Sequence, residues 1–275
     1  MTIRRILTAL LILAPGLALA QSEGVATFKV IAHGAREDGK GAPNGTYRIA
    51  FSKTAYRMDM QVDVSSMGGQ RSHGNSDAPR AFSMTTISKL SDPDKAYMLN
   101  DRSKTYSVID RAQLRAQTRH SDEKWTVRRT GRDTVAGIPC EKATIASSTG
   151  SSIETCIATD FLVSSAWWSV LSQRQGGNDL WIKSMGDAGL KGFPIRMRYR
   201  TAQGEDRVDM ELVSLDRHGL PAAMFEVPAS YKQTNMVETM MSPEQQKMMN
   251  DAIAKMTPEQ RKAYEDAMKK SQGNH

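Results

Sequence analysis

Hydrophobic and polar residues alternate with a period of two through most of the central chain. Such runs occur at 25–32, 56–64, 193–200 and 207–212, and glycine, asparagine, aspartate or proline residues separate them. Residues two apart in a strand share one face of a sheet, so each run predicts a strand with one apolar and one polar face. Short runs of this kind are typical of an antiparallel sheet with one buried face.

The runs at 193–200 and 207–212 predict a hairpin with a definite register. One register places apolar residues opposite apolar residues and arginines opposite carboxylates. The pairs are Tyr199 with Val208, Arg198 with Asp209, Met197 with Met210, Arg196 with Glu211 and Ile195 with Leu212. Opposite charges across a ladder add a few tenths of a kcal/mol and fix the register. The three successive outward arginines, which resemble an anion-binding surface, are therefore expected to form a neutralised outer face.

Two helices are expected to interrupt the strands. The segment 159–177 begins at a Thr/Asp cap, contains Trp167 and Trp168 and ends at a glycine pair; the segment 178–190 is shorter and contains Trp181. Helices with an apolar face usually cover one face of an antiparallel sheet. The chain is thus expected to be an α+β protein.

The C-terminal part contains a duplication of 15 residues. The stretch 241–255, MSPEQQKMMNDAIAK, aligns without gaps on 256–270, MTPEQRKAYEDAMKK. Each copy has a Ser or Thr cap, a proline at the first helical position and a glutamine at the third. Residues 233–275 are therefore expected to form an amphipathic tail of two short helices, or one helix bent at Pro258. Its methionines are soft ligands for copper(I), but no His or Cys accompanies them, so packing is expected and no metal site is predicted.

The N-terminus has the pattern of a secretory signal peptide. Arg4 and Arg5 precede a short apolar run, and Ala18-Leu19-Ala20 forms a cleavage site, so residues 1–20 are expected to be removed. Export predicts a periplasmic protein, leaves secretion beyond the outer membrane open, and makes cytosolic nucleic acid an unsuitable partner. No later run is apolar and long enough for a membrane helix.

Cys140 and Cys156 are the only cysteines. In an exported chain two cysteines suggest one disulfide, and a hairpin centred near Ser148 would place them directly opposite each other, with Lys142 facing Glu154. A redox or metal pair is the alternative, but the spacing is not C-x-x-C and no His lies nearby.

Most of the excess positive charge lies between residues 111 and 132. A helix capped by Asp110 would place Arg111, Arg115 and Arg119 on one stripe, and Arg128 and Arg129 follow in the next strand. These five arginines are candidates for binding an anionic surface such as lipid head groups. A solvated helix face is the alternative and is the more common outcome for such a stripe.

Catalytic signatures are absent from the sequence. It contains no G-x-S-x-G, H-E-x-x-H, P-loop or dinucleotide-binding motif, and no Cys, His and Asp residues with metal or triad spacing. We therefore expect a non-catalytic protein with no cofactor and no metal.

Several segments together resemble a known family. They are YRMDMQV with the Gly68-Gly69 loop, KAYMLNDRSKTYSVID, VAGIPCEKATI with IETCIATDF, and MFEVPASYK. They resemble the exported bacterial family called domain of unknown function 4412 and, more distantly, the LolA/LolB-like envelope proteins. The resemblance covers roughly residues 25–232. It implies that residues 21–232 form a LolA-like domain, a curved antiparallel half-barrel with helices over its concave face and a cavity for acyl chains.

Two functions follow from these observations. Bulky residues on the expected inner face are candidates for an apolar ligand cavity, although they could equally fill a dry core: Met58, Met60, Trp168, Met197, Tyr199 and Met210. The first hypothesis is a protein that binds a lipid or a lipoprotein acyl chain there. The second is an envelope interaction protein or stress-related adaptor that docks a partner protein through the Met-rich tail or the basic segment 111–132.

Overall fold

The computed structural model describes residues 23–33, 44–63, 81–113, 122–159, 161, 180–241 and 243–273. The predicted signal peptide at 1–20 lies outside the described residues, as does the expected helix at 159–177 apart from Thr159 and Phe161. No helix within the described ranges is long and apolar enough to cross a membrane.

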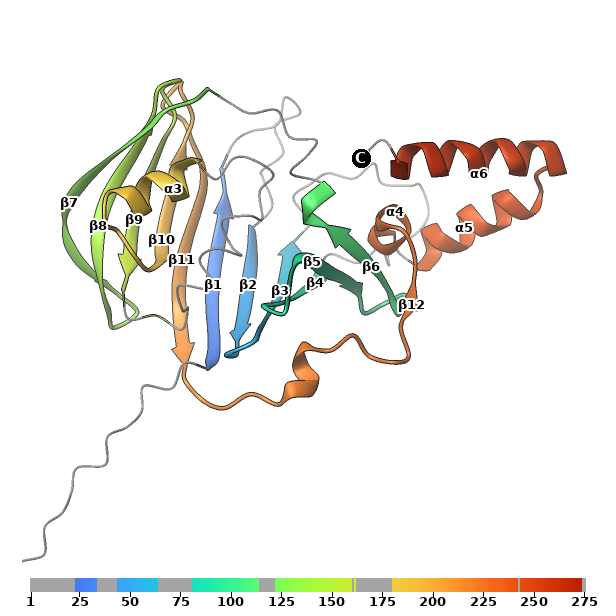
Figure 1. The fold of residues 1–275 in the computed structure, drawn as a ribbon, viewed down its shortest axis with the longest axis horizontal. Coiled ribbons are helices and arrows are strands. Elements are labelled where there is room, and N and C mark those ends of the chain that lie inside the picture. The colour runs from blue at the N-terminus through green and yellow to red at the C-terminus, as the bar shows by residue number, and fades with distance from the viewer. Residues whose placement is uncertain are drawn as a thin grey trace, which may run out of the picture.

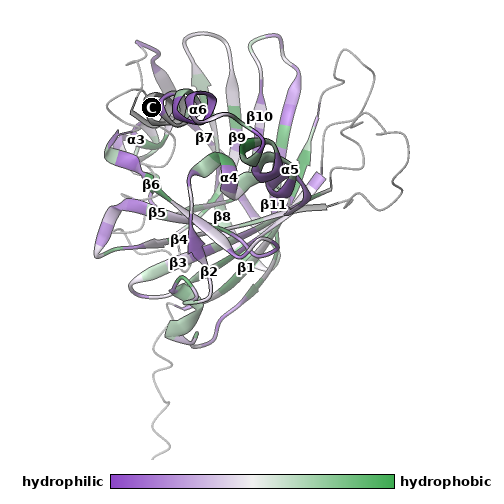
Figure 2. Ribbon diagram, turned by 90° about the vertical axis from the view of Figure 1, so that its right-hand side faces the viewer, coloured by the Kyte–Doolittle hydropathy of each residue, from purple (hydrophilic) through white to green (hydrophobic). Residues whose placement is uncertain are grey.

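Within the described residues, twelve strands form one sheet, which curves into an open half-barrel (Figures 1 and 2). The strands are β1 (Gly24–Ala32), β2 (Asn44–Phe51), β3 (Ala55–Asp63), β4 (Ala81–Lys89), β5 (Asp92–Asn100), β6 (Thr105–Asp110), β7 (Trp125–Val135), β8 (Ile138–Ser147), β9 (Ser152–Ala158), β10 (Phe193–Arg200), β11 (Asp206–Asp216) and β12 (Lys232–Gln233). The helices are α3 (Leu180–Asp187), α4 (Met236–Met240), α5 (Pro243–Ala254) and α6 (Pro258–Gly273), with a 3₁₀ turn η3 (Ala222–Phe225).

Two meanders are joined into this sheet by the pairing of β1 with β11. The strand order is β12-β6-β5-β4-β3-β2-β1-β11-β10-β9-β8-β7, so β1–β6 form one meander and β7–β11 the other. All neighbours are antiparallel except the short β12, which runs parallel to β6. The order ends at β7 and β12 and the sheet is not closed. The predicted α+β fold with an open, curved antiparallel sheet is therefore confirmed.

Apolar clusters lie on both faces of the sheet. One face carries a core built on aromatic rings, in which Phe161 stacks on Phe193 at 4.8 Å and both rings contact Phe51. On this face α3 covers a second cluster, with Met185 and Leu190 buried against β8 and β9. The opposite face carries a smaller cluster closed by Phe225 of η3. The crossover from β11 to β12 thus covers the back of the first meander.

Cys140 and Cys156 form the predicted disulfide, with Cα atoms 5.4 Å apart. The predicted register is wrong by two residues, because Lys142 lies opposite Cys156 and Thr144 opposite Glu154. The disulfide is therefore diagonal and the ion pair between Lys142 and Glu154 is not a directly opposed pair.

The turn explains this shift. Ser147 and Ser151 close a three-residue loop whose last residue, Gly150, has a φ of 98°. A loop that ends on a left-handed residue moves the hairpin centre from Ser148 to Thr149. Because the shift is even, every side chain stays on its expected face.

The duplicated part of the tail forms two helices after the sheet, as predicted, and the short helix α4 precedes them. α5 and α6 run back along each other and project from the half-barrel (Figure 1). At the start of α6 the backbone N–H of Gln260 donates to Thr257 Oγ1, and the N–H of Thr257 donates to the Gln260 side chain. This reciprocal pair is the expected capping box, and Pro258 separates the two helices.

We expect the disulfide to contribute measurably to stability. Replacing both cysteines, Cys140→Ser with Cys156→Ser, should lower the free energy of unfolding by about 3 kcal/mol, because the unfolded chain loses a closed loop. Urea unfolding at equilibrium measures this change. The wild type in a reducing agent is the matched control and should unfold at the same midpoint as the variant. A loss below about 1 kcal/mol would mean that the bridge constrains little.

Candidate functional site

The inner face of the sheet is defined here as the face against which α3 and α4 pack. α4 is held on it by Asn100, whose side-chain amide donates to the carbonyls of Thr239 at 2.8 Å and Met241 at 3.0 Å. Thr239 is buried there. The two helices thus approach the same face from the two meanders, while the crossover with η3 lies on the other, outer face.

Five of the six predicted ligand-binding residues lie on this inner face. Met197 lies directly opposite Met210, and Tyr199 lies opposite Val208, so the predicted register of the hairpin is confirmed for these pairs. Met58 and Met60 lie on β3, with Met60 opposite Tyr47. The sixth residue, Trp168, lies outside the described residues.

These five side chains are half-buried. Met58 and Met210 pack against the aromatic core, while Met197 and Tyr199 pack against the cluster under α3 together with Trp181. These four therefore keep one side on the core and another side partly exposed. The inner face is neither a sealed core nor an open aqueous surface.

Two hollows formed by described residues lie elsewhere. One of about 360 Å³ is lined by Arg48, Arg57, Asp59 and Met224 among others, and one of about 210 Å³ lies beside Phe225. Both lie on the outer face, between the sheet and the crossover. None of the five ligand-binding candidates that the structure describes lines either of them.

The larger hollow contains a polar cluster that the sequence patterns did not predict. Arg57 Nε donates to Asp59 at 2.8 Å, and the Thr85 hydroxyl donates to the same carboxylate oxygen at 2.7 Å. Arg57 also donates to the carbonyl of Met224 at 3.4 Å, which links β3 to η3. The two-residue spacing of Arg57 and Asp59 could have indicated this pair, because it places both side chains on one face of a strand.

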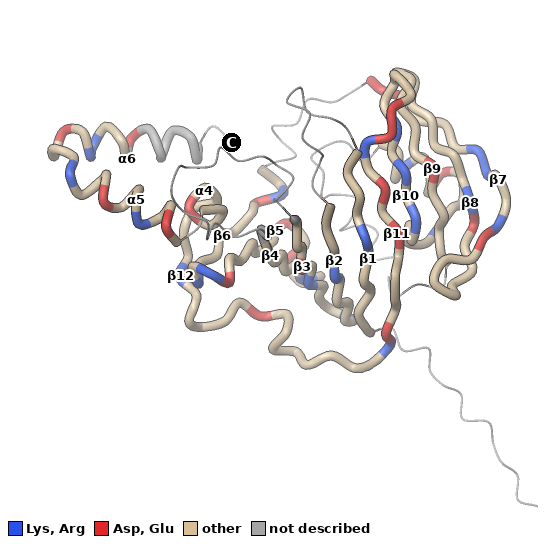
Figure 3. The backbone as a smooth tube through the Cα atoms, turned by 180° about the vertical axis from the view of Figure 1, so that it is seen from behind, with Lys and Arg blue, Asp and Glu red and all other residues tan. Residues whose placement is uncertain are grey.

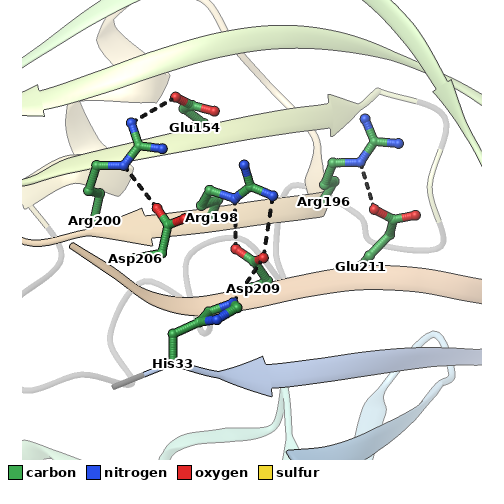
Figure 4. A network of polar contacts seen from close by, with 8 residues as sticks. All are labelled: His33, Glu154, Arg196, Arg198, Arg200, Asp206, Asp209 and Glu211. Carbon is green, nitrogen blue, oxygen red and sulfur yellow. Dashed lines mark hydrogen bonds and ion pairs between the residues drawn. The ribbon is translucent and has the colours of Figure 1, made fainter. Parts of the chain in front are cut away.

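The three arginines of β10 are paired with carboxylates on the outer face, as predicted for Arg196 and Arg198 (Figure 4). Arg196 binds Glu211 at 2.9 Å, Arg198 binds Asp209 at 2.9 Å, and Arg200 binds Asp206 at 2.9 Å. Further partners come from neighbouring strands: Asp133 for Arg196, Glu154 for Arg200 and His33 for Asp209. Basic and acidic residues accordingly mix along these strands (Figure 3), and this row is not a free anion-binding surface.

Two of these carboxyl groups have a lowered pKa. At Asp209 partial burial acts to raise the pKa, but hydrogen bonds with Arg198 and His33 outweigh it, so the pKa lies below its ordinary value of 3.8. At Asp133 the backbone N–H of Thr134 and the Arg196 guanidinium lower the pKa. Both groups are therefore carboxylates at neutral pH.

The placement predicted for Arg111 is wrong. It does not lie on an exposed stripe but is 3% exposed, and its guanidinium donates to Tyr56 Oη at 3.0 Å, Ser88 Oγ at 2.6 Å and the Pro93 carbonyl at 2.8 Å. The chain turns inward directly after β6, so the long side chain reaches back under β4 and β5. Arg111 is unsuited to contact head groups at the surface.

The other basic candidates are not brought together with Arg111. Arg115 and Arg119 lie outside the described residues. Arg128 and Arg129 lie on the edge strand β7, and Arg129 binds Glu141 at 3.1 Å and the Ala188 carbonyl at 2.8 Å. The predicted Asp110 cap is present, since its carboxylate accepts from the Gln113 N–H at 2.9 Å.

Apolar side chains are exposed on the tail. Those of Met236, Val237, Met240 and Met248 are between 45% and 64% exposed. No residue of α5 is buried, and this helix contacts α6 through a weak bond from the Tyr264 hydroxyl to Met249 Sδ at 3.7 Å. Much of this helical hairpin faces solvent (Figure 2).

The fold defines a protein with an open, curved antiparallel sheet whose inner face is partly exposed. Residues 41–231 match the family model described as "Domain of unknown function (DUF4412)", which covers well over half of the chain, and the chain belongs to this family. No curated protein matches it.

Solved structures with a similar sheet are remote in sequence. An uncharacterized conserved protein from Thermus thermophilus is 10% identical with a TM-score of 0.41, over 78% of this chain and 90% of that one. The MucA/MucB complex of Pseudomonas aeruginosa matches with 12% sequence identity and a TM-score of 0.39, over 79% of this chain and 61% of that one. A putative outer membrane lipoprotein-sorting protein domain from Vibrio parahaemolyticus is 9% identical with a TM-score of 0.31, over 74% and 88%. Similarity this remote assigns no ligand or partner.

The arginine row predicts a specific acid dependence. The lowered pKa of Asp209 means that its pairing stabilises the fold above about pH 4 and is lost as the pH falls further, because the unfolded chain then binds the proton more readily. Asp209→Asn should therefore lower the free energy of unfolding at pH 7 by less than about 1 kcal/mol, with the difference shrinking as the pH falls below about 4.

Urea unfolding between pH 7 and pH 3 measures this difference. Asp122→Asn, at an exposed aspartate outside the sheet, is the control and should follow the wild type. A constant difference between Asp209→Asn and the wild type across this pH range would show that ionisation of Asp209 is not the cause.

Proposed function

We propose that the protein is a non-catalytic periplasmic binding protein that holds the acyl chain of a lipid or lipoprotein on the inner face of its half-barrel. The signal-peptide pattern at residues 1–20 supports export to the envelope. The proposal concerns a class of ligand and not one named lipid.

The observation that carries this proposal is the half-burial of bulky side chains on the inner face. Tyr47, Met58, Met197, Tyr199 and Met210 all pack on buried core residues yet keep part of their surface exposed. An apolar surface that folding leaves partly uncovered gains free energy when an apolar ligand covers it. Unbranched thioether side chains adapt to the shape of a flexible chain.

The distribution of charge supports an apolar ligand. The arginines of β10 point to the outer face and are paired there, and the directly opposed inner pairs Met197 with Met210 and Met60 with Met84 are uncharged. A charged ligand would gain little from these pairs, whereas an acyl chain needs no counter-charge.

A second candidate function is docking of an envelope protein on the tail. It is favoured by the exposed apolar side chains of α4 and α5, which folding leaves uncovered. Methionine-rich helical surfaces suit adaptable protein contacts. The tail is held on the domain by the hydrogen bonds of Asn100 with α4. A partner protein bound to α4 would therefore lie near the inner face.

The first function predicts bound lipid. Protein purified from its native envelope should carry lipid in native mass spectrometry and should bind a fluorescent fatty acid. Met197→Ser should raise the Kd for that probe about tenfold, because burying a methionine against the ligand contributes roughly 1.5–3 kcal/mol.

Val213→Ser is the matched control. Val213 lies on β11 next to the strand of Met197 but is 58% exposed, so its loss should leave the Kd unchanged. Absence of lipid together with absence of probe binding would contradict the function. Equal Kd changes in both variants would contradict the assignment to the inner face.

The second function predicts that partner capture depends on the tail. Removing residues 242–275 should abolish crosslinking to an envelope protein while the circular dichroism of the sheet persists, and Met240→Ser with Met248→Ser should weaken it. Lys255→Ser, an exposed polar change on the same tail, is the control. Capture that survives the deletion would exclude the tail as the docking surface.

A further inference from the structure

Four methionines from three adjacent strands lie together on the inner face. Met58 and Met60 come from β3, Met84 from β4 and Met98 from β5. Met60 lies directly opposite Met84, Met58 lies opposite Thr86, and Thr86 lies opposite Met98. Because residues two apart share a face, all four side chains project to the same side. Met84 is next to each of the other three, once directly and twice on a diagonal.

This arrangement allows the sulfur atoms to converge. Directly opposite residues have Cβ atoms about 4.5–5.5 Å apart, and diagonal neighbours about 7–8 Å or somewhat less. A methionine side chain is long, unbranched and turns about three bonds, so sulfurs from neighbouring strands can meet above Met84. The register thus provides three or four thioethers within reach of one ion.

The four methionines are partly shielded from water, and the nearby buried guanidinium of Arg111 is hydrogen-bonded to Tyr56 and Ser88. Met98 is 3% exposed and Thr86 is 6% exposed, while Met58, Met60 and Met84 are half-buried. The next residue across the sheet is Ser107, which lies opposite Met98, is 2% exposed and has a hydroxyl without a hydrogen-bond partner in the structure. On the other side Met60 lies opposite Tyr47. These flanking residues supply no carboxylate, which a hard cation would prefer.

We propose that Met58, Met60, Met84 and Met98 form a thioether site for a soft monovalent metal ion, copper(I), with silver(I) as its non-redox equivalent. Thioether sulfur selects such ions over magnesium, calcium or manganese. The described residues contain no group of three or more His, Cys, Asp or Glu side chains able to hold a metal. Both cysteines of the chain are bonded to each other, so methionines are its remaining sulfur ligands.

The site differs in chemistry from the proposed acyl-chain surface, although the two share Met58 and Met60. Leucine conserves the apolar character and approximate volume of methionine but removes the sulfur. Met84 belongs to the thioether site and not to the acyl-chain surface, so Met84→Leu separates the two ligands: it should lose the metal and keep the acyl chain.

The test is a titration of the full chain, freed of its signal peptide, with copper(I) in competition with bicinchoninate, and with silver(I) in calorimetry. One tightly bound ion per chain is expected, with a sulfur-only coordination shell in X-ray absorption. Met84→Leu should raise the Kd at least about tenfold, and Met60→Leu should do the same if Met84→Leu folds poorly. Met197→Leu, elsewhere on the inner face, and Met248→Leu, on the exposed tail, are the controls and should bind as the wild type does.

Several results would overturn the proposal. They are no copper(I) binding by the wild type, nitrogen or oxygen ligands in the absorption spectrum, an unchanged Kd in both Met84→Leu and Met60→Leu, or an equal loss in Met248→Leu. The fluorescent fatty acid measured on Met84→Leu keeps the two functions apart. Loss of copper(I) with retained probe binding supports the metal site whether or not lipid is the natural ligand.

Discussion

The pairing of β10 with β11 is the interaction on which the two faces of the molecule depend. Arg196 and Arg198 meet Glu211 and Asp209 on one side of this ladder, and Met197 meets Met210 on the other. A slip of one residue would move the arginines to the inner face and the methionines into water. Each exposed ion pair contributes less than about 1 kcal/mol, so the row acts mainly by making other registers unfavourable.

This register spreads through the rest of the sheet because β11 also pairs with β1. Met210 lies opposite Val30 of β1, and Phe28 lies two residues before Val30 and so on the same face. Phe28 lies opposite Tyr47 of β2, and Tyr47 lies opposite Met60 of β3. The assignment of side chains to the inner or outer face at β10 therefore fixes the same assignment across the β11–β1 pairing as far as β3. The methionines of both meanders project to one side for this reason. The proposed acyl-chain surface and the proposed thioether site both follow from that shared orientation.

The face of the sheet on which a side chain lies could be predicted from the sequence more reliably than the register in which two strands pair. Alternation identified the inner and outer residues of β3, β10 and β11. In the cysteine hairpin, however, the predicted register was wrong by two residues, since Cys140 does not lie opposite Cys156. The loop of this hairpin ends on a left-handed residue, Gly150, which shifts the centre of the turn by one residue. The β10–β11 register could be predicted because charge and apolar pairing agree along five successive positions.

Other features depend on contacts that sequence spacing does not contain. Arg111 has the spacing of an exposed helical stripe, but its acceptors Tyr56, Ser88 and Pro93 come from distant parts of the chain. β4 was not recognised because the polar residues Thr85, Thr86 and Ser88 interrupt its apolar pattern. Without β4, Met84 could not be placed between Met60 and Met98. The grouping of these methionines is visible only when three strands are aligned.

The central claim is that the inner-face methionines are sheltered and the tail methionines are not. Oxidation by dilute peroxide, followed residue by residue by mass spectrometry, tests it most directly, because methionine oxidation follows exposure of the sulfur. The account predicts rapid oxidation of Met240 and Met248, slower oxidation of Met197 and Met210, and the slowest at Met98. Oxidation of Met197 and Met210 as fast as that of Met248 would contradict it.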